Sequence, residues 1–116
     1  MGIFEGFKKH YETTDSAADL SLVTHYYRNN FNQVKEALMQ SAKELDYKVT
    51  YENDERKEFV FKNSDSEVII TVITINPIET TVDFTVNTSG IFSFGKGRKL
   101  IQDLYQSLDK RLKLKN

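Results

Sequence analysis

The sequence contains no cysteine and only one proline, Pro77, among its 116 residues. The absence of cysteine excludes disulfide bonds, thiolate nucleophiles and cysteine-ligated zinc, and it is typical of proteins in a reducing compartment. No stretch approaches the roughly 20 apolar residues that a membrane-spanning helix needs, and the first nine residues lack the apolar core of a signal peptide. We therefore expect a cytoplasmic protein that is neither secreted nor inserted in a membrane.

Neither sign of charge dominates the chain, because 16 Lys and Arg residues stand against 17 Asp and Glu residues, a formal net charge of −1. The whole chain therefore has no electrostatic attraction to nucleic acid or to an anionic membrane. Residues 96–116 are an exception, since seven basic and two acidic side chains give a local charge of 7 − 2 = +5. Cations suit the C-terminal end of a helix, so we interpret this excess as structural and expect no nucleic-acid partner.

β-Branched residues, in contrast, are abundant, and they form two runs on either side of the Asn76-Pro77 dipeptide. The first run is Val68-Ile-Ile-Thr-Val-Ile-Thr-Ile-Asn76 and the second is Thr80-Thr-Val-Asp-Phe-Thr-Val-Asn-Thr88. Two such runs separated by a turn signal are typical of a β-hairpin. The hairpin is the clearest local structure that the sequence predicts.

Three shorter strands and two helices complete the pattern. Strands are indicated over residues 22–28 and 47–52 and around Phe59 and Phe61. Asn30 and Gln33 resemble a capping box that opens a helix over residues 31–46, and a second apolar stripe predicts a helix over 97–112. The short connections between strands favour an antiparallel sheet over crossover units.

These elements predict an α+β fold with the order β-α-β-β-β-β-α. We expect a two-layer sandwich, in which an antiparallel sheet of four to five strands carries both helices on one face. Residues 1–20 read as a flexible N-terminal segment, and residues 21–116 as a single α+β domain. Ile3, Phe4 and Phe7 lie in the N-terminal segment, where contact with a membrane or a partner is the alternative to a frayed tail.

The element order is similar to that of helix-grip and TATA-binding-protein-like folds. Three motifs carry a closer resemblance: Thr24-His-Tyr-Tyr-Arg28, Thr81-Val-Asp-Phe-Thr-Val-Asn-Thr88, and the stretch from Gly95 to Lys110. Together they resemble a group of small uncharacterised cytosolic proteins of Gram-positive bacteria. The resemblance implies a cytoplasmic location and carries no catalytic assignment.

The sequence nominates no catalytic residue, metal ligand or cofactor. His10 and His25 are fifteen positions apart and lack the spacing that places two ligands on one helical face. Asp83 is the only acid expected in the middle of a strand, where it alternates with Thr81 and Thr85 on the solvent side. A polar pocket around Asp83 is the alternative, and we do not expect an enzyme.

One turn is a candidate anion site. Glycines and basic residues alternate between the last strand and the final helix, at Gly95, Lys96, Gly97, Arg98 and Lys99. The free N–H groups of a helix N-terminus attract anions, and cations placed there are unfavourable unless an anion offsets them. An acid of the domain itself is the other possible anion, which would make the turn purely structural.

The first strand of the hairpin is apolar on both faces. Val68, Ile70 and Val72 point to one side, whereas Ile69, Ile73 and Ile75 point to the other and need separate cover. Self-association, a partner protein, the N-terminal segment or an apolar cavity would each supply it. The leading hypothesis is a non-enzymatic interaction module, and a homodimer is one form that it could take. The alternative is a protein that binds a small apolar or anionic ligand between the sheet and the C-terminal helix.

Overall fold

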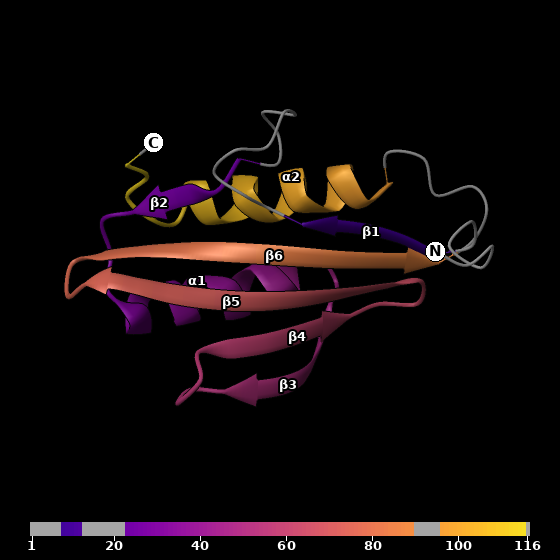
Figure 1. Cartoon of the computed structure of the whole chain (residues 1–116), viewed down its shortest axis with the longest axis horizontal. Helices are drawn as coiled ribbons and strands as arrows, with labels where there is room; N and C mark the ends of the chain where they lie inside the picture. The colour runs from indigo at the N-terminus through magenta and orange to yellow at the C-terminus, as the bar shows by residue number, and fades with distance from the viewer. Residues whose placement is uncertain (1–7, 13–22, 90–95, 116) are drawn as a thin grey trace.

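The computed structural model describes residues 8–12, 23–89 and 96–115, which form one sheet and two helices (Figure 1). In chain order the elements are β1 (Lys8–Glu12), β2 (His25–Tyr27), α1 (Phe31–Glu44), β3 (Lys48–Asn53), β4 (Glu58–Lys62), β5 (Ser66–Asn76), β6 (Glu79–Ser89) and α2 (Lys96–Asp109). From β2 onward this is the predicted order of strand, helix, four strands and helix. The α+β class is confirmed.

Strand β1 is an addition to the sequence prediction. It pairs antiparallel with β6, so that Lys8 lies opposite Ser89 and Glu12 lies opposite Thr85. Its sequence, Lys8-Lys-His-Tyr-Glu12, has no β-branched residue, and pairing through backbone groups leaves no such signal. β1 falls inside the segment 1–20 that was expected to be flexible. The rest of that segment, with Ile3, Phe4 and Phe7, lies outside the described residues.

The sheet is antiparallel and has the order β1-β6-β5-β4-β3, with β2 also paired to β6. β1 pairs with the last residues of β6, and β2 pairs with Thr80 to Val82 near its start, so the two short strands share one edge. The C-terminal segment covers the outer side of β2, because Lys115 N–H donates to the Tyr26 carbonyl at 2.7 Å. The β5–β6 hairpin therefore lies at the centre of the sheet.

Helix α1 begins and ends where its local sequence dictates. The Asn30 side chain accepts a hydrogen bond from Gln33 N–H at 2.9 Å, and the Gln33 side chain accepts one from Asn30 N–H at 3.1 Å. This reciprocal pair is the predicted capping box. At the other end Asp46 takes φ 62°, and Tyr47 N–H donates to the Ala42 carbonyl at 2.8 Å, which closes the helix.

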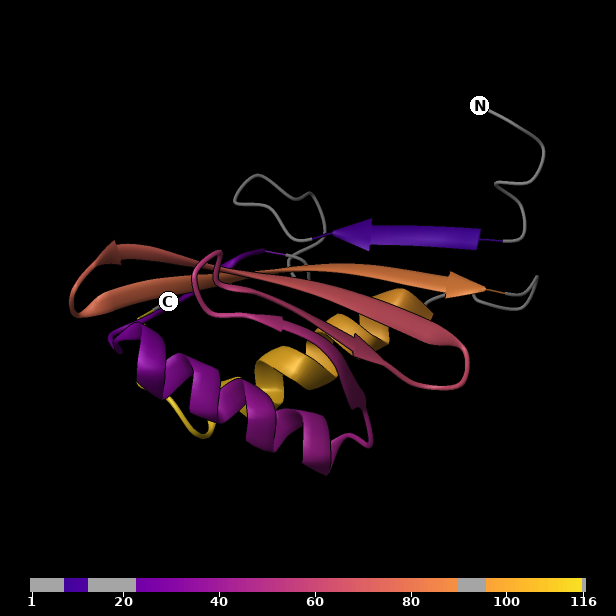
Figure 2. The ribbon, with the colours of Figure 1, turned by 90° about the horizontal axis from the view of Figure 1, so that it is seen from below.

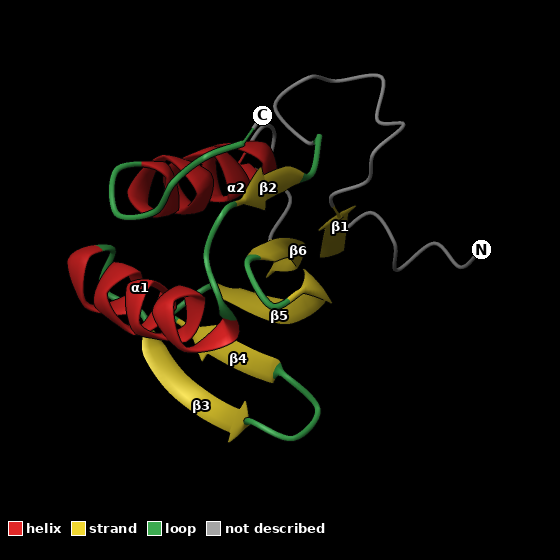
Figure 3. Cartoon of the chain, turned by 90° about the vertical axis from the view of Figure 1, so that its left-hand side faces the viewer, coloured by secondary structure: helices red, strands yellow, loops and turns green. Residues whose placement is uncertain are grey.

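Both helices pack on the same face of the sheet, as predicted (Figure 2). α1 contacts β3 and β5, and α2 contacts β6 and β1, so the two helices divide this face between them (Figure 3). The sheet contributes the large side chains of this core, namely Phe59, Phe61, Val68, Ile70, Val72, Val82, Phe84 and Val86, all at most 3% exposed. Tyr105 of α2 packs edge-on against Phe84, with ring centroids 4.9 Å apart.

A polar cluster joins the two helices at their outer surface. Ser107 of α2 lies 2.7 Å from the Ser41 hydroxyl of α1 and donates to Glu44 at 2.8 Å. Arg111 and Lys110 bind the same carboxylate at 2.7 and 2.5 Å. Hydrogen bonds from Lys110, Ser107 and Arg111 lower the pKa of Glu44 from 4.5 to about 2. Lys110 and Arg111 therefore share an acidic partner within the domain.

Candidate functional site

The face of the sheet opposite the helices carries two of the three isoleucines that the sequence singled out. Ile69, Ile73 and Ile75 are 37%, 40% and 50% exposed, whereas their neighbour Ile70 is fully buried under the helices. The alternation along β5 places Ile69 and Ile73 as predicted, on the side that neither helix covers, whereas Ile75 falls at a register shift between Thr74 and Asn76, where both sides of the strand are exposed. We call the side of Ile69 and Ile73 the open face; its described residues on β4, β5 and β6 include Glu58, Val60, Lys62, Glu67, Ile69, Thr71, Ile73, Thr81, Asp83, Thr85 and Asn87.

Tyr51 also belongs to the open face. Simple alternation from Tyr47 and Val49 would place it in the core, but the pairing of β3 with β4 shifts register between Val49 and Tyr51. This bulge turns Tyr51 outward, where it lies opposite Val60 and is 43% exposed. Because Val60 lies opposite Ile69, the apolar strip extends from β5 across to β3.

Two acids interrupt the apolar strip. Thr71 of β5 lies opposite Glu58 on one side and opposite Asp83 on the other, so the three form one row across the sheet. The row lies between the rows of Ile69 and Ile73. Asp83 is half-buried and accepts a hydrogen bond from the Thr24 hydroxyl at 3.2 Å. The predicted position of Asp83 on the side away from the helices is correct.

The predicted anion turn is described only from Lys96 onward, since Gly95 lies outside the described residues. Lys96 forms an ion pair with Asp65, and Lys99 forms one with Asp103 at 2.9 Å. Gly97 is buried and Arg98 is exposed, both in the first turn of α2. Acidic side chains of the domain therefore form ion pairs with both lysines, as expected for the alternative in which the turn is structural.

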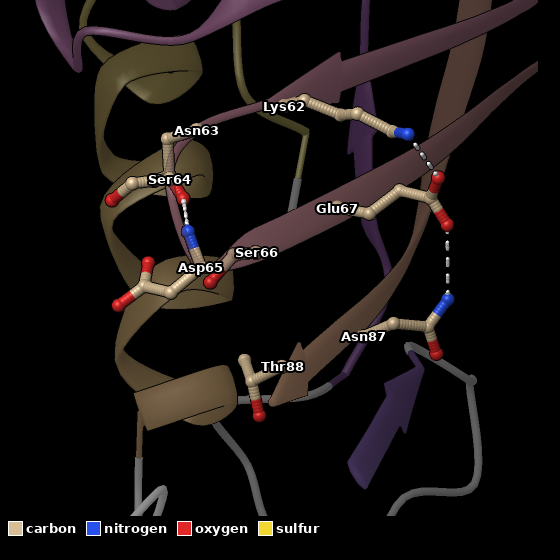
Figure 4. Close-up of a pocket in the computed structure, with 8 residues that line it drawn as sticks. All are labelled: Lys62, Asn63, Ser64, Asp65, Ser66, Glu67, Asn87 and Thr88. Atoms are coloured by element: carbon tan, nitrogen blue, oxygen red, sulfur yellow. Dashed lines mark hydrogen bonds and ion pairs between the residues drawn. The ribbon is translucent and has the colours of Figure 1, made fainter. Parts of the chain in front are cut away.

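A polar cavity of about 270 Å³ lies near this turn, at the end of the sheet (Figure 4). Glu67 binds both Lys62 and Asn87 at 3.4 Å on one side of the cavity. On the other side, the hydroxyls of Ser66 and Thr88 are buried without a hydrogen-bond partner among the described residues. These two residues are directly paired across β5 and β6, and sequence reasoning gave no signal for their burial.

A second cluster joins β2 to the end of α2, and the sequence analysis did not find it. His25 Nδ1 lies 3.0 Å from Asp109 Oδ1, and the buried Tyr27 hydroxyl donates to the same oxygen at 2.8 Å. The His25 ring stacks on Tyr105 with centroids 3.9 Å apart. Burial, followed by the charge of Asp109, raises the pKa of Tyr27 above its ordinary value. Histidine and aspartate are 84 positions apart, so no local spacing could reveal the pair.

This cluster lines a cavity of about 280 Å³ against the outer side of α2. Its other walls are Gln102, Tyr105 and Gln106. The cavity lies beside β2 on the outer side of α2, whereas the alternative ligand site was expected between the sheet and the C-terminal helix. The imidazole, the two amides and the Asp109 carboxylate offer polar contacts, and the Tyr105 ring offers an apolar surface.

No model of a known protein family matches this chain, and no curated protein matches it in sequence. The resemblances noted from the sequence therefore stay predictions. In the described part of the chain, neither helix has the length and apolar character needed to cross a bilayer. The function has to be inferred from the geometry of the open face and of the cavities.

Proposed function

We propose that this protein is a non-enzymatic cytoplasmic interaction module, which binds another polypeptide that presents apolar side chains to the open face of its sheet. The observation that carries the proposal is the exposure of Ile69 and Ile73, at 37% and 40%, on the central strand β5. Apolar side chains scattered singly on a surface need no explanation, but a contiguous strip indicates an interaction site. Here the strip also includes Val60 and Tyr51.

The location of the strip supports the same function. β5 has a neighbouring strand on each side, so its backbone is already paired and only its side chains are available to a partner. A partner would therefore dock on the face of the sheet rather than extend it by adding a strand. Each isoleucine is at most half exposed to begin with and would gain about 1 kcal/mol on full burial. Two such side chains favour a transient complex over a permanent one.

A fluorescent, neutral amphipathic peptide of about 18 residues, with leucines on one helical stripe and glutamines elsewhere, tests the proposal. We expect it to bind the full chain, and the double variant Ile69→Thr/Ile73→Thr to lose about tenfold in affinity. Threonine keeps the β-branched shape that strands favour, so the sheet should stay intact. Equal binding by the wild type and the double variant would contradict the proposal.

Self-association is the other way to cover this face, and sedimentation velocity at micromolar concentration detects it. A dimer that dissociates in Ile69→Thr/Ile73→Thr would still support an interaction module, with a second copy as the partner. A dimer that persists in the variant would show that copies meet elsewhere, and would count against the open face.

A small-ligand binder is the second candidate, favoured by the 280 Å³ cavity beside His25 and Tyr105. The dye anilinonaphthalene sulfonate is apolar and anionic, so it is a suitable probe for both candidates. Loss of its fluorescence in His25→Ala would favour the cavity. Loss in Ile69→Thr/Ile73→Thr would favour the open face.

A further inference from the structure

We propose that the end of the molecule at the β5–β6 turn docks on an anionic lipid bilayer, with Ile78 in the interfacial layer and three cations beside the lipid phosphates. The cations are Arg28, Lys113 and Lys115, which line one cavity together with Ile78. This docking goes beyond the proposed function, because it uses another surface and does not need the apolar strip on β5. The observation that carries it is the most exposed large apolar side chain of the described residues, placed among three cations.

Ile78 is exposed at a position where the described fold does not need an apolar residue. It is 74% exposed in the turn between β5 and β6, which Figure 1 shows at one end of the long axis. Pro77 fixes the backbone of this turn, and the Asn76 side chain accepts a hydrogen bond from Ile78 N–H at 3.0 Å. Polar residues and glycine are the usual occupants of such a turn, so it would form as well without the isoleucine. Ile75 and Leu114, 50% and 42% exposed, add apolar surface at the same end.

The segment after α2 brings two of the cations to this end. Arg28 N–H donates to the Lys113 carbonyl at 2.8 Å, and Lys115 N–H donates to the Tyr26 carbonyl at 2.7 Å. Residues 113–115 therefore pair with β2 like a further strand, and alternation places Lys113 and Lys115 on the same side of it. A cavity of about 480 Å³ between this segment and the turn is lined by Arg28, Asn76, Ile78, Glu79, Lys113 and Lys115.

One acid stands against the three cations of the cavity, so its local charge is 3 − 1 = +2. Glu79 forms an ion pair with Lys115 at 2.7 Å, and the more distant charge of Arg28 also acts on this carboxylate. Within the described part of the chain, neither Arg28 nor Lys113 forms an ion pair. The next acid along β6 is Asp83, four residues or about 13 Å from Glu79, which exceeds the screening length of about 8 Å at physiological salt. Positive charge therefore remains to be balanced at this end.

The dipole of the last helix does not account for these lysines. α2 ends at Asp109, whereas Lys113 and Lys115 lie beyond it, in the segment that pairs with β2, where the effect of the dipole has fallen off. Anionic lipids attract such cations, and a lysine can lay its aliphatic part beside Ile78 while its charge reaches a phosphate. Lipids adapt to a turn that projects from the end of a molecule, whereas a folded partner needs a matching surface. The combination of charge and shape therefore favours a bilayer.

Co-sedimentation with lipid vesicles tests the proposal on the full chain. At low salt, we expect the chain to bind vesicles of phosphatidylcholine and phosphatidylglycerol in equal parts about tenfold more tightly than vesicles of phosphatidylcholine alone. Raising the ionic strength should remove most of this difference, because the cations are exposed. Equal binding to the two kinds of vesicle, or no binding to either, would overturn the proposal.

Variants tie vesicle binding to this cavity. Arg28→Gln/Lys113→Gln should weaken binding about tenfold or more, and Ile78→Asn about fivefold. These side chains are exposed, so the fold should persist in each variant. Lys43→Gln/Lys48→Gln removes the same charge near the end of the sheet remote from the turn, and should change binding less than about twofold. Equal losses in the two double variants would mean that only net charge matters, and would overturn the proposal.

A fluorescent reporter tests the position of Ile78 directly. The chain contains no tryptophan, so Ile78→Trp places a single indole in the turn. Its emission should shift to the blue on binding to the anionic vesicles, and acrylamide should quench it less, because tryptophan favours the membrane interface. Tyr51→Trp, on the open face, is the matched control and should show neither change. An unchanged emission in Ile78→Trp would place the turn outside the interface and contradict the proposal.

An acidic polypeptide is the other partner that these cations could attract. A glutamate-rich peptide that binds the wild type and Ile78→Asn equally, in a chain that does not bind vesicles, would identify such a partner and overturn the bilayer. The variant Ile69→Thr/Ile73→Thr should bind vesicles as the wild type does, because its changes lie outside the cavity. Loss of vesicle binding in that variant would place the membrane contact on the open face and contradict the proposed turn.

Discussion

Strand β5 has nearly the same residues on its two sides, but the two helices cover only one of them. Val68, Ile70 and Val72 are at most 3% exposed beneath the two helices, whereas Ile69, Ile73 and Ile75 are 37–50% exposed. A strand with this composition is typical of sheets that are covered on both faces. The difference shows that the apolar content of β5 exceeds what the described fold buries, and the excess lies where a partner could reach it.

Truncating one isoleucine on each side of β5 gives the largest expected difference in stability. Ile70→Ala should lower the free energy of unfolding by about 2–5 kcal/mol, because it leaves a cavity in a filled core. Ile73→Ala removes the same atoms from a side chain that is 40% exposed, and should cost less than about 1 kcal/mol. Urea unfolding followed by circular dichroism measures both. Equal losses would mean that the open face is covered in the free protein.

Two tyrosines on the helix-covered side differ in whether the hydroxyl group is hydrogen-bonded, and this difference can be tested within the core. Tyr27 donates to Asp109 at 2.8 Å, so Tyr27→Phe should cost about 1.5–3 kcal/mol. In the described part of the chain the Tyr47 hydroxyl is buried without a hydrogen-bond partner, and burial raises its pKa to about 12. Tyr47→Phe should therefore be neutral or stabilising by up to about 1 kcal/mol. A large loss in Tyr47→Phe would reveal a partner for that hydroxyl.

The sequence predicted the parts of the fold that depend on local patterns. The capping box at Asn30 and Gln33, the hairpin around Asn76 and the alternation that exposes Ile69 and Ile73 are all local, and the structure contains each of them. Strand β1 and the His25–Asp109 pair were missed, because each is set by a partner far away along the chain. The bulge that turns Tyr51 outward has no signal in the alternation of the strand.

The smallest expected effect is the pH dependence of the stability that Glu44 contributes where the two helices meet. The pKa of Glu44 is lowered from 4.5 to about 2 in the folded chain, so this carboxylate contributes stability that is fully present above about pH 4.5. That contribution is lost as the pH falls towards 2. Glu44→Gln should therefore be less stable than the wild type at pH 7, with a difference that shrinks at acidic pH. Urea midpoints at pH 7, 4 and 2.5 measure it, and a difference independent of pH would contradict the assignment.

The most direct test of the open face is to map the binding of the neutral leucine–glutamine peptide by NMR on the ¹⁵N-labelled full chain. We predict chemical-shift changes centred on β4, β5 and β6 around Ile69, Thr71 and Ile73, and their loss in Ile69→Thr/Ile73→Thr. Changes centred instead on His25, Tyr105 and Asp109, and retained in that variant, would contradict the account and place the binding site in the cavity beside α2.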